Sequence, residues 1–267
     1  MSLTDGFGAG ARFLPIGFRT LMRREILRYV RRPRNTFLPP LITNVLYFSV
    51  FGVILGERVG EIQGVSYILF LLPGLVVLGA ISNSFENASF SIFHGRWNEY
   101  IQATTTSPIS YTQMVLAYVV SSALRGVLIG VLIALVGAVF TPVTVEHPLY
   151  LIAFMAVITT LFAGFGVIGG LWARDFDYLT VMNQFILRPL VFFGGVFYSL
   201  EILPPFWTYV SLLNPMVYMV NGVRYGFLGA ETVDVGPNSA LVVLTVAAVV
   251  VVLIDIALFR RGYGLTE

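Results

Sequence analysis

Six long apolar segments constrain this chain more than any other feature of its sequence. A helix of about 20 apolar residues crosses a hydrocarbon layer of about 30 Å, and each segment reaches or approaches that length. They lie at about 37–56, 66–84, 113–140, 149–172, 180–198 and 240–259. The chain is 57% hydrophobic and only 11% charged, whereas soluble domains carry about 25% charged residues. We therefore expect an all-α membrane protein with six transmembrane helices in a single transmembrane domain, residues 1–267.

A seventh apolar region, residues 199–229, is interrupted by prolines. Pro204-Pro205 and Asn214-Pro215 divide it into pieces that are too short to cross a bilayer. Backbone at membrane depth must satisfy its own hydrogen bonds, which favours two short helices buried against the bundle. We therefore predict a re-entrant helical hairpin on the outer face, between the fifth and sixth spans.

Basic residues are distributed unevenly along the chain. All sixteen are arginines, eight of them lie between Arg12 and Arg34, and Arg260-Arg261 follow the last span. The loops assigned to the outside carry Glu57, Glu61, Glu146, Glu201, Glu231 and Asp234 against Arg58 and Arg224. Because short basic loops and tails stay in the cytoplasm, we expect a multi-pass protein of the plasma (inner) membrane with both termini cytoplasmic.

Residues 17–34 have the pattern of a basic amphipathic helix. At about 100° per residue, one side collects Phe18, Leu21, Met22, Ile26, Tyr29 and Val30, and Arg19, Arg23, Arg24, Arg28 and Arg31 fall outside it. Such a helix lies in the membrane interface, so we expect membrane lipids as partners and no nucleic acid. Glu25 falls near the centre of the apolar side. It either pairs locally with Arg28 or snorkels, or it contacts a partner protein or the next loop.

Motifs for catalysis are absent from the sequence. Residues 164–169, GFGVIG, match G-x-G-x-x-G but lie inside an apolar span, where small residues bring helices together. No GxxxxGK[ST] loop exists, because the chain has no lysine, and neither H-E-x-x-H nor G-x-S-x-G occurs. The chain also has no cysteine. We therefore expect no enzyme, no metal site and no cofactor bound by this chain.

Intramembrane charges are the default markers of function in a membrane protein. Here the candidates are Arg125, Arg188 and Asp255. Arg125 lies either deep in the third span or at the membrane boundary, if residues 111–124 extend that helix into the cytoplasm. Arg188 and Asp255 lie at comparable depths, and an ion pair between them is one interpretation.

Residues 194–229 read GGVFYSLEILPPFWTYVSLLNPMVYMVNGVRYGFLG. This stretch resembles the C-terminal signature of ABC-2-type transporter permeases, which include nodulation-factor, drug and polysaccharide exporters, and the likeness extends over nearly the whole chain. The resemblance implies the membrane-spanning permease subunit of an ATP-driven ABC exporter. Such a subunit forms a homodimer and binds two copies of a cytoplasmic ABC ATPase, which holds ATP and Mg²⁺. It moves an amphipathic, lipid-like, drug or glycan substrate by alternating access.

The resemblance also implies sites. ATPase docking would use the interfacial helix and a cytoplasmic coupling loop at 86–110, through Glu25, Glu86, Arg96, Trp97 and Glu99. Where the family usually has acidic residues after the position of Ile101, this chain has Gln102-Ala103. The hairpin would cap the substrate path with Phe197, Tyr198, Pro204, Pro205, Phe206, Trp207 and Tyr209, although aromatic residues there also fit an ordinary interfacial belt.

Three other functions compete with the exporter. An intramembrane enzyme would need clustered His, Ser, Asp or Glu residues on one face, and the sequence lacks such a cluster. An ion channel or secondary transporter without an ATPase partner would need chains of intramembrane ionisable residues or internal repeats, and the sequence shows neither. A membrane scaffold that transports nothing would show no ATPase stimulated by lipid, glycan or drug.

Overall fold

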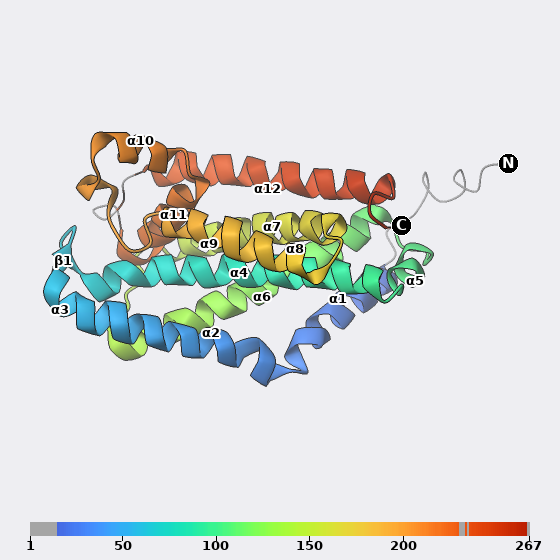
Figure 1. Cartoon of the computed structure of the whole chain (residues 1–267), viewed down its shortest axis with the longest axis horizontal. Coiled ribbons are helices and arrows are strands. Elements are labelled where there is room, and N and C mark those ends of the chain that lie inside the picture. The colour runs from blue at the N-terminus through green and yellow to red at the C-terminus, as the bar shows by residue number, and fades with distance from the viewer. Residues whose placement is uncertain (1–14, 230–232, 234, 266–267) are drawn as a thin grey trace.

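The computed structural model describes residues 15–229, 233 and 235–265, and within them the chain forms an elongated bundle of helices (Figure 1). The predicted outside charges Glu231 and Asp234 lie beyond the described residues. Five helices in the described part are long and apolar enough to cross a membrane. They are Pro33–Val59, Tyr67–Trp97, Tyr111–Phe140, Pro148–Trp172 and Pro237–Arg260.

The first third of the chain contains the amphipathic helix and the first span. Its elements are α1 (Pro15–Val30), α2 (Pro33–Tyr47), the π-helical η1 (Phe48–Leu55) and α3 (Gly56–Val59). Pro33 begins α2, where a missing N–H costs no hydrogen bond. A short hairpin follows, in which β1 (Glu61–Ile62) pairs antiparallel with β2 (Val65–Ser66). Gln63 and Gly64 have positive φ angles, the conformation that a tight hairpin turn needs, so a small sheet departs from the all-α expectation.

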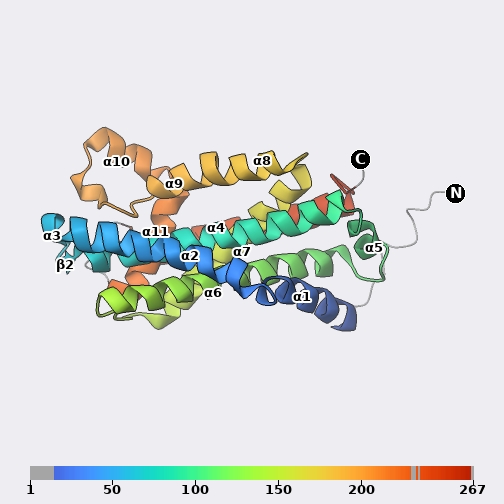
Figure 2. The same cartoon turned by 60° about the horizontal axis from the view of Figure 1, so that its bottom comes forward.

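The centre of the bundle consists of α4 (Tyr67–Trp97), α6 (Tyr111–Phe140) and α7 (Pro148–Trp172). α4 is the most buried of the long helices and lies between α2 and α7 in the first view (Figure 1), and the turned view shows it running along the length of the bundle (Figure 2). The short α5 (Ile101–Thr105) connects α4 to α6. A capping box begins α6: the Ser110 side chain accepts from the Gln113 N–H, and the Gln113 side chain accepts from the Ser110 N–H. Residues 86–97 of the predicted coupling loop continue α4 without a break, so the helical part of that loop belongs to the second long helix.

The predicted fifth span is shorter than expected. Helix α8 (Phe176–Val181), the π-helical η2 (Met182–Leu187) and α9 (Arg188–Phe192) follow one another without a break. The helical course ends before Gly194-Gly195, where Gly195 takes a φ of 75° that glycine adopts without strain. This segment therefore falls short of the five long helices, and the six-span count stays a prediction.

The rest of the chain consists of short helices followed by the last span. They are η3 (Leu200–Ile202), α10 (Pro205–Leu212), α11 (Pro215–Leu228) and α12 (Pro237–Arg260). The two predicted proline breaks fall where expected, since α10 begins at Pro205 and α11 at Pro215. α10 and β1 both lie at the end of the bundle that is far from the C-terminus (Figure 1). Two short helices are thus present, and their re-entrant position in a membrane stays a prediction.

Glycines let the central helices pack backbone against backbone. A Cβ on Gly166 of α7 would lie 2.5 Å from the Phe85 carbonyl oxygen of α4, and one on Gly170 would lie 2.6 Å from that of Ser89. A Cβ on Gly126 of α6 would lie 2.7 Å from the Ala80 oxygen. The G-x-G-x-x-G match therefore packs helices together, as small residues do in membrane proteins.

Charge separates the two ends of the bundle. One end, which we call the acidic end, contains α3, the β-hairpin and α10, with Glu57, Glu61, Glu146 and Glu201. The other, which we call the basic end, contains α5, the outer part of α1 and the end of α12 (Figure 1). Its arginines include Arg19, Arg23, Arg96, Arg174, Arg260 and Arg261. Arg224, expected in an outside loop, is instead fully buried in α11, 3.8 Å from the centre of the Phe70 ring.

Candidate functional site

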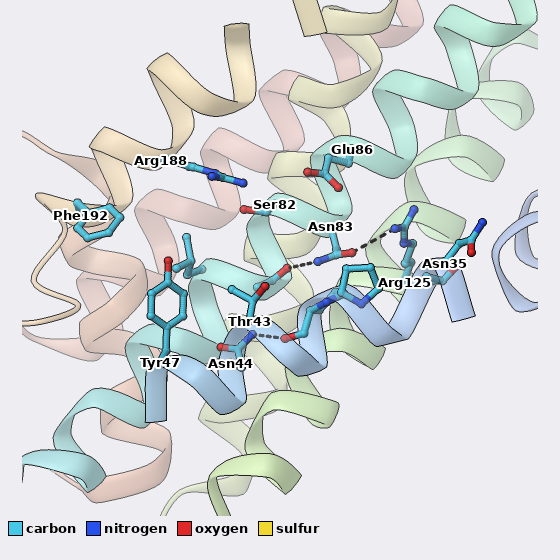
Figure 3. A pocket seen from close by; sticks show the side chains of 15 residues that line it. Asn35, Thr43, Asn44, Tyr47, Ser82, Asn83, Glu86, Arg125, Arg188 and Phe192 are labelled. Atoms are coloured by element: carbon cyan, nitrogen blue, oxygen red, sulfur yellow. Dashed lines mark hydrogen bonds between the residues drawn. The ribbon is translucent and has the colours of Figure 1, made fainter. Parts of the chain in front are cut away.

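A polar pocket of about 430 Å³ opens on one side of the bundle, between α2, α4, α6 and α9 (Figure 3). Its polar lining residues are Asn35, Thr36, Thr43, Asn44, Ser82, Asn83, Glu86, Arg125 and Arg188. Ligand sites commonly enclose about 300–1,000 Å³. The pocket therefore has room for a small ligand or for one part of a larger one.

Arg125 is held in the pocket wall by two asparagines of α4. Its Nη2 donates to Asn83 Oδ1 and its Nη1 to Asn87 Oδ1, both at 3.2 Å. Asn83 and Asn87 are four residues apart and so share one face of the helix. Both acceptors are neutral, and no carboxylate oxygen of the described residues lies within 4.0 Å of the guanidinium. Arg125 therefore has two neutral hydrogen-bond acceptors and no ion-pair partner within 4.0 Å among the described residues.

Asn87 also connects the pocket wall to α1. Arg28 Nη2 donates to Asn87 Oδ1 at 3.1 Å and to the Asn87 backbone oxygen at 2.9 Å. Asn87 Nδ2 in turn donates to Ser122 Oγ of α6 at 2.8 Å. One buried amide thus joins α1, α4 and α6. The polar part of the pocket lies close to the point where α1 passes into α2.

Glu86 and Arg188 face the pocket from opposite walls (Figure 3). Glu86 accepts a hydrogen bond from Asn183 Nδ2 of η2. Arg188 makes no hydrogen bond or ion pair with any described residue. Glu86 lies about three helical turns before the end of α4, away from Trp97 and Glu99. We therefore reassign Glu86 from the predicted docking group to the pocket.

Aromatic rings close the pocket toward the acidic end. Tyr47 and Phe192 line it. The Phe197 ring centre lies 4.9 Å from that of Phe192, 5.1 Å from that of Phe51 and 6.3 Å from that of Tyr47. Phe197, a predicted gate residue, therefore belongs to the cluster that separates the pocket from the acidic end.

The other predicted gate residues lie on α10 and beside it: Tyr198, Pro204, Pro205, Phe206, Trp207 and Tyr209. Phe206, Trp207 and Tyr209 are 69%, 50% and 72% exposed, which fits an interfacial belt as well as a gate. Their part in transport stays a prediction.

Glu25 is buried at 2% exposure, although α1 lies on the outside of the bundle. Its carboxylate pairs with Arg24 at 2.9 Å and with Arg28 at 3.3 Å, and it accepts a hydrogen bond from Ser91 of α4. The local pairing with Arg28 is confirmed, and so is a contact with the segment predicted as the next loop. The carboxylate is fully occupied within the chain, so docking by Glu25 itself stays an unsupported prediction.

The three remaining docking candidates lie together at the basic end. Arg96 Nη1 donates to the Gly170 and Ala173 oxygens at the end of α7, at 2.9 and 2.8 Å. Trp97 is 60% exposed, and Glu99 is exposed beside it. A groove of about 330 Å³ runs next to them, along α4, α5, the α7–α8 turn and the C-terminal residues. Arg96 therefore supports the groove, while Trp97 and Glu99 are free to contact another protein.

Asp255 is not paired with Arg188. It is fully buried on α12 against Gly164 of α7, and neither carboxylate oxygen has a hydrogen-bond partner among the described residues. Arg188 instead lines the pocket. The suggested ion pair is therefore wrong, because the two side chains lie in different parts of the bundle.

Sequence reasoning missed Ser82 and Asn83, which line the pocket, and Asn87 and Asn183, which bond the lining residues Arg125 and Glu86. A signal for three of them exists in the run SNSFENAS, residues 82–89, which places polar side chains within a helix that continues to Trp97. The second span was expected to end near residue 84, so this run was assigned to a loop. A polar run inside a long helix would have indicated a polar site between helices.

Comparison with known proteins places the chain in a family. Residues 17–228 match the sequence model of ABC-2 type transporters. The chain is 36% identical over 250 residues to the inner membrane transport permease YadH of Escherichia coli (strain K12), which covers 94% of this chain and 97% of that protein. It is 25% identical over 260 residues to nodulation protein J of Rhizobium leguminosarum bv. viciae, covering 94% and 98%. Nodulation protein J of Bradyrhizobium diazoefficiens is 27% identical over 268 positions, covering 97% and 98%. The chain is therefore a membrane transport permease and belongs to the ABC-2 type transporter family.

Proposed function

We propose that this permease is the membrane-spanning subunit of an ATP-driven exporter of amphipathic substrates. Membership of the ABC-2 family supports a separate ATPase partner, which would hold ATP and Mg²⁺. The observation that carries the proposal is the pocket, because polar groups at one side of it and aromatic rings at the other suit a molecule with a polar and an apolar part.

The separation of charge between the two ends supports the orientation. Short basic segments stay in the cytoplasm, so the basic end, with α1 and the end of α12, faces the cytoplasm. Asn87 binds both Arg28 of α1 and Arg125. An interfacial α1 then puts Arg125 near the inner membrane boundary, and the first half of α6 extends into the cytoplasm. Substrate would enter the pocket from the inner leaflet and leave past Phe197.

A second copy of the chain would complete the path. The pocket opens between two exposed apolar surfaces, one on α2 and η1 and one on η2 and α9. Their exposed residues include Leu38, Ile42, Leu46 and Val50 on the first and Phe185, Ile186, Phe192 and Phe193 on the second. A homodimer that joins these surfaces encloses the pocket between two copies, and each copy offers one docking groove to one ATPase subunit.

The docking groove provides the test. We would pull down the tagged permease from native membranes in mild detergent and identify the bound proteins. The expected result is a stoichiometric ATPase that is lost in Trp97→Ala with Glu99→Ala. The matched control is Trp207→Ala with Glu201→Ala, which changes the same residue types at the acidic end and should keep the ATPase.

Two outcomes would overturn the proposal. Reproducible absence of any ATPase, together with substrate flux that needs no ATP, would favour an ion channel or a secondary transporter. An ATPase lost equally from both double variants would remove the groove from docking. Transport in vesicles by the wild-type complex must also require hydrolysable ATP.

A further inference from the structure

The pocket has an excess of positive charge. Its lining contains two guanidinium groups, Arg125 and Arg188, and one carboxylate, Glu86. Glu86 accepts a hydrogen bond from Asn183, and neither arginine lies within 4.0 Å of a described carboxylate oxygen. Arg28, on α1, donates a hydrogen bond to Asn87 Oδ1, the same amide oxygen that accepts a hydrogen bond from Arg125. With every group ionised, the lining has a formal charge of +1.

Hydrogen-bond donors in the pocket lack partners. Arg188 donates to no described residue, and Arg125 Nε is buried without an acceptor in the described part of the chain. The hydroxyls of Thr43 and Ser82 also line the pocket and make no hydrogen bond to the described residues. A buried charged donor without an acceptor is costly, which applies to Arg125 Nε, whereas Arg188 is exposed at the pocket and shares the single carboxylate Glu86 with Arg125. An anion in the pocket would remove that cost, because guanidinium groups bind phosphate and carboxylate oxygens strongly.

The pocket is also divided between polar and apolar sides. Arg125 and Asn35 lie at one end of it, while Tyr47 and Phe192 lie at the other (Figure 3). Phe192 is itself exposed and continues onto the apolar surface of α9. Arg188 lies toward the Phe192 end, four residues before Phe192 on α9, so a charged head bound between Arg125 and Arg188 leaves an apolar chain directed past Phe192 and Tyr47 toward the lipid (Figure 3). A free inorganic anion would leave these aromatic surfaces unused.

We propose that the pocket binds the anionic head of an amphiphile, such as a single-chain phosphate ester, and that Arg125 and Arg188 recognise its charge. The proposal rests on the proposed function, because it names the substrate class of the same pocket. Arg188 is the residue to change, since it bonds no described residue, whereas Arg125 also holds α6 to α4.

The test is saturable binding of radiolabelled dodecyl phosphate to the full-length chain in phosphatidylcholine nanodiscs, with empty nanodiscs subtracted. Dodecylphosphocholine and dodecyltrimethylammonium, with the same apolar chain, serve as competitors. Dodecyl phosphate should bind about tenfold more tightly than either, because charge-assisted hydrogen bonds form with its head alone. Arg188→Gln should weaken the binding of dodecyl phosphate by about tenfold. It should change the binding of dodecylphosphocholine by no more than about twofold. Arg58→Gln, the same change at the acidic end, should alter neither.

Each contrary outcome refutes a distinct statement. Equal binding of the three head groups would refute recognition of an anionic head, and so would a preference for phosphate that survives Arg188→Gln. Either result leaves the exporter proposal unaffected. Displacement by inorganic phosphate at the same concentration as dodecyl phosphate overturns the amphiphile and indicates a free-anion site. No saturable binding of any of the three overturns the pocket as the substrate path as well.

Discussion

Replacing the small side chain of Asn87 should strongly lower the stability of the bundle. The Asn87 amide binds Arg28 of α1, Arg125 of α6 and Ser122 of α6 while it sits on α4. Asn87→Leu keeps a side chain of similar length but removes both the acceptor and the donor. Two helices, α1 and α6, then lose their common hydrogen-bonding partner on α4, and Ser122 and two guanidinium nitrogens lose a bond each.

The cost can be worked out from those bonds. Two of them have a charged donor and contribute about 1.5–3 kcal/mol each, and the bond to Ser122 contributes about 1 kcal/mol. Arg28 keeps its bond to the Asn87 backbone oxygen, and Arg125 keeps its bond to Asn83, so the lower end applies, about 3–4 kcal/mol. With roughly 2–4 °C of Tm per kcal/mol for domains near this size, Tm should fall by roughly 6–16 °C.

The assay is thermal unfolding of the purified, tagged chain in one detergent, followed by loss of monodisperse protein. Asn87→Asp keeps the acceptors for both arginines and should retain most of the Tm. Asn98→Leu is the matched control, because Asn98 is exposed and its side chain bonds only His94 of its own helix. An Asn87→Leu protein with the same Tm as Asn98→Leu would refute the reasoning.

Three further substitutions test the packing and the buried charges. Gly126→Val should abolish stable insertion or lower Tm strongly, because its Cβ meets Ser84 and the backbone of α4; a normal Tm would show that the helices separate easily. Asp255→Asn should leave Tm within about 2 °C of wild type, because the Asp255 carboxylate makes no hydrogen bond with the described residues that the substitution would remove, whereas a large fall would show that the carboxylate is paired. Arg96→Ala should lower Tm even without an ATPase, because two carbonyls at the end of α7 lose their donor; an unchanged Tm with lost ATPase binding would instead make Arg96 a docking residue.

Much of the architecture follows from local sequence signals. The long apolar runs locate the five long helices, and the prolines mark the starts of α2, α10 and α11. These signals act within a few residues, through hydrophobic length and missing N–H groups. The unexpected parts depend on partners far along the chain. α4 continues past residue 84 because its polar side chains find Arg28, Arg125 and Asn183 on other helices.

The candidate site was predicted only in part for the same reason. Arg125, Arg188 and Phe197 were singled out because charges in spans and aromatic residues near proline breaks are conspicuous in any sequence. Glu86 was assigned to the docking loop because composition does not show which way a helical residue faces. For Glu25, near the centre of the apolar side, the sequence left local pairing and a contact with the next segment as alternatives, and the structure shows both, with Arg28 and Ser91.

The glycine contacts of α4 have a consequence for how this family can acquire new substrates. Gly126, Gly166 and Gly170 bring α6 and α7 so close to α4 that no larger side chain fits there. A larger side chain at one of these glycines would therefore impair the assembly of the bundle, and we expect few tolerated substitutions there. The walls formed by α2 and α9 have no such contacts and present Thr43, Tyr47 and Phe192 to the pocket. Substitutions on these two helices are the route by which one scaffold would change its cargo while its central helices stay the same.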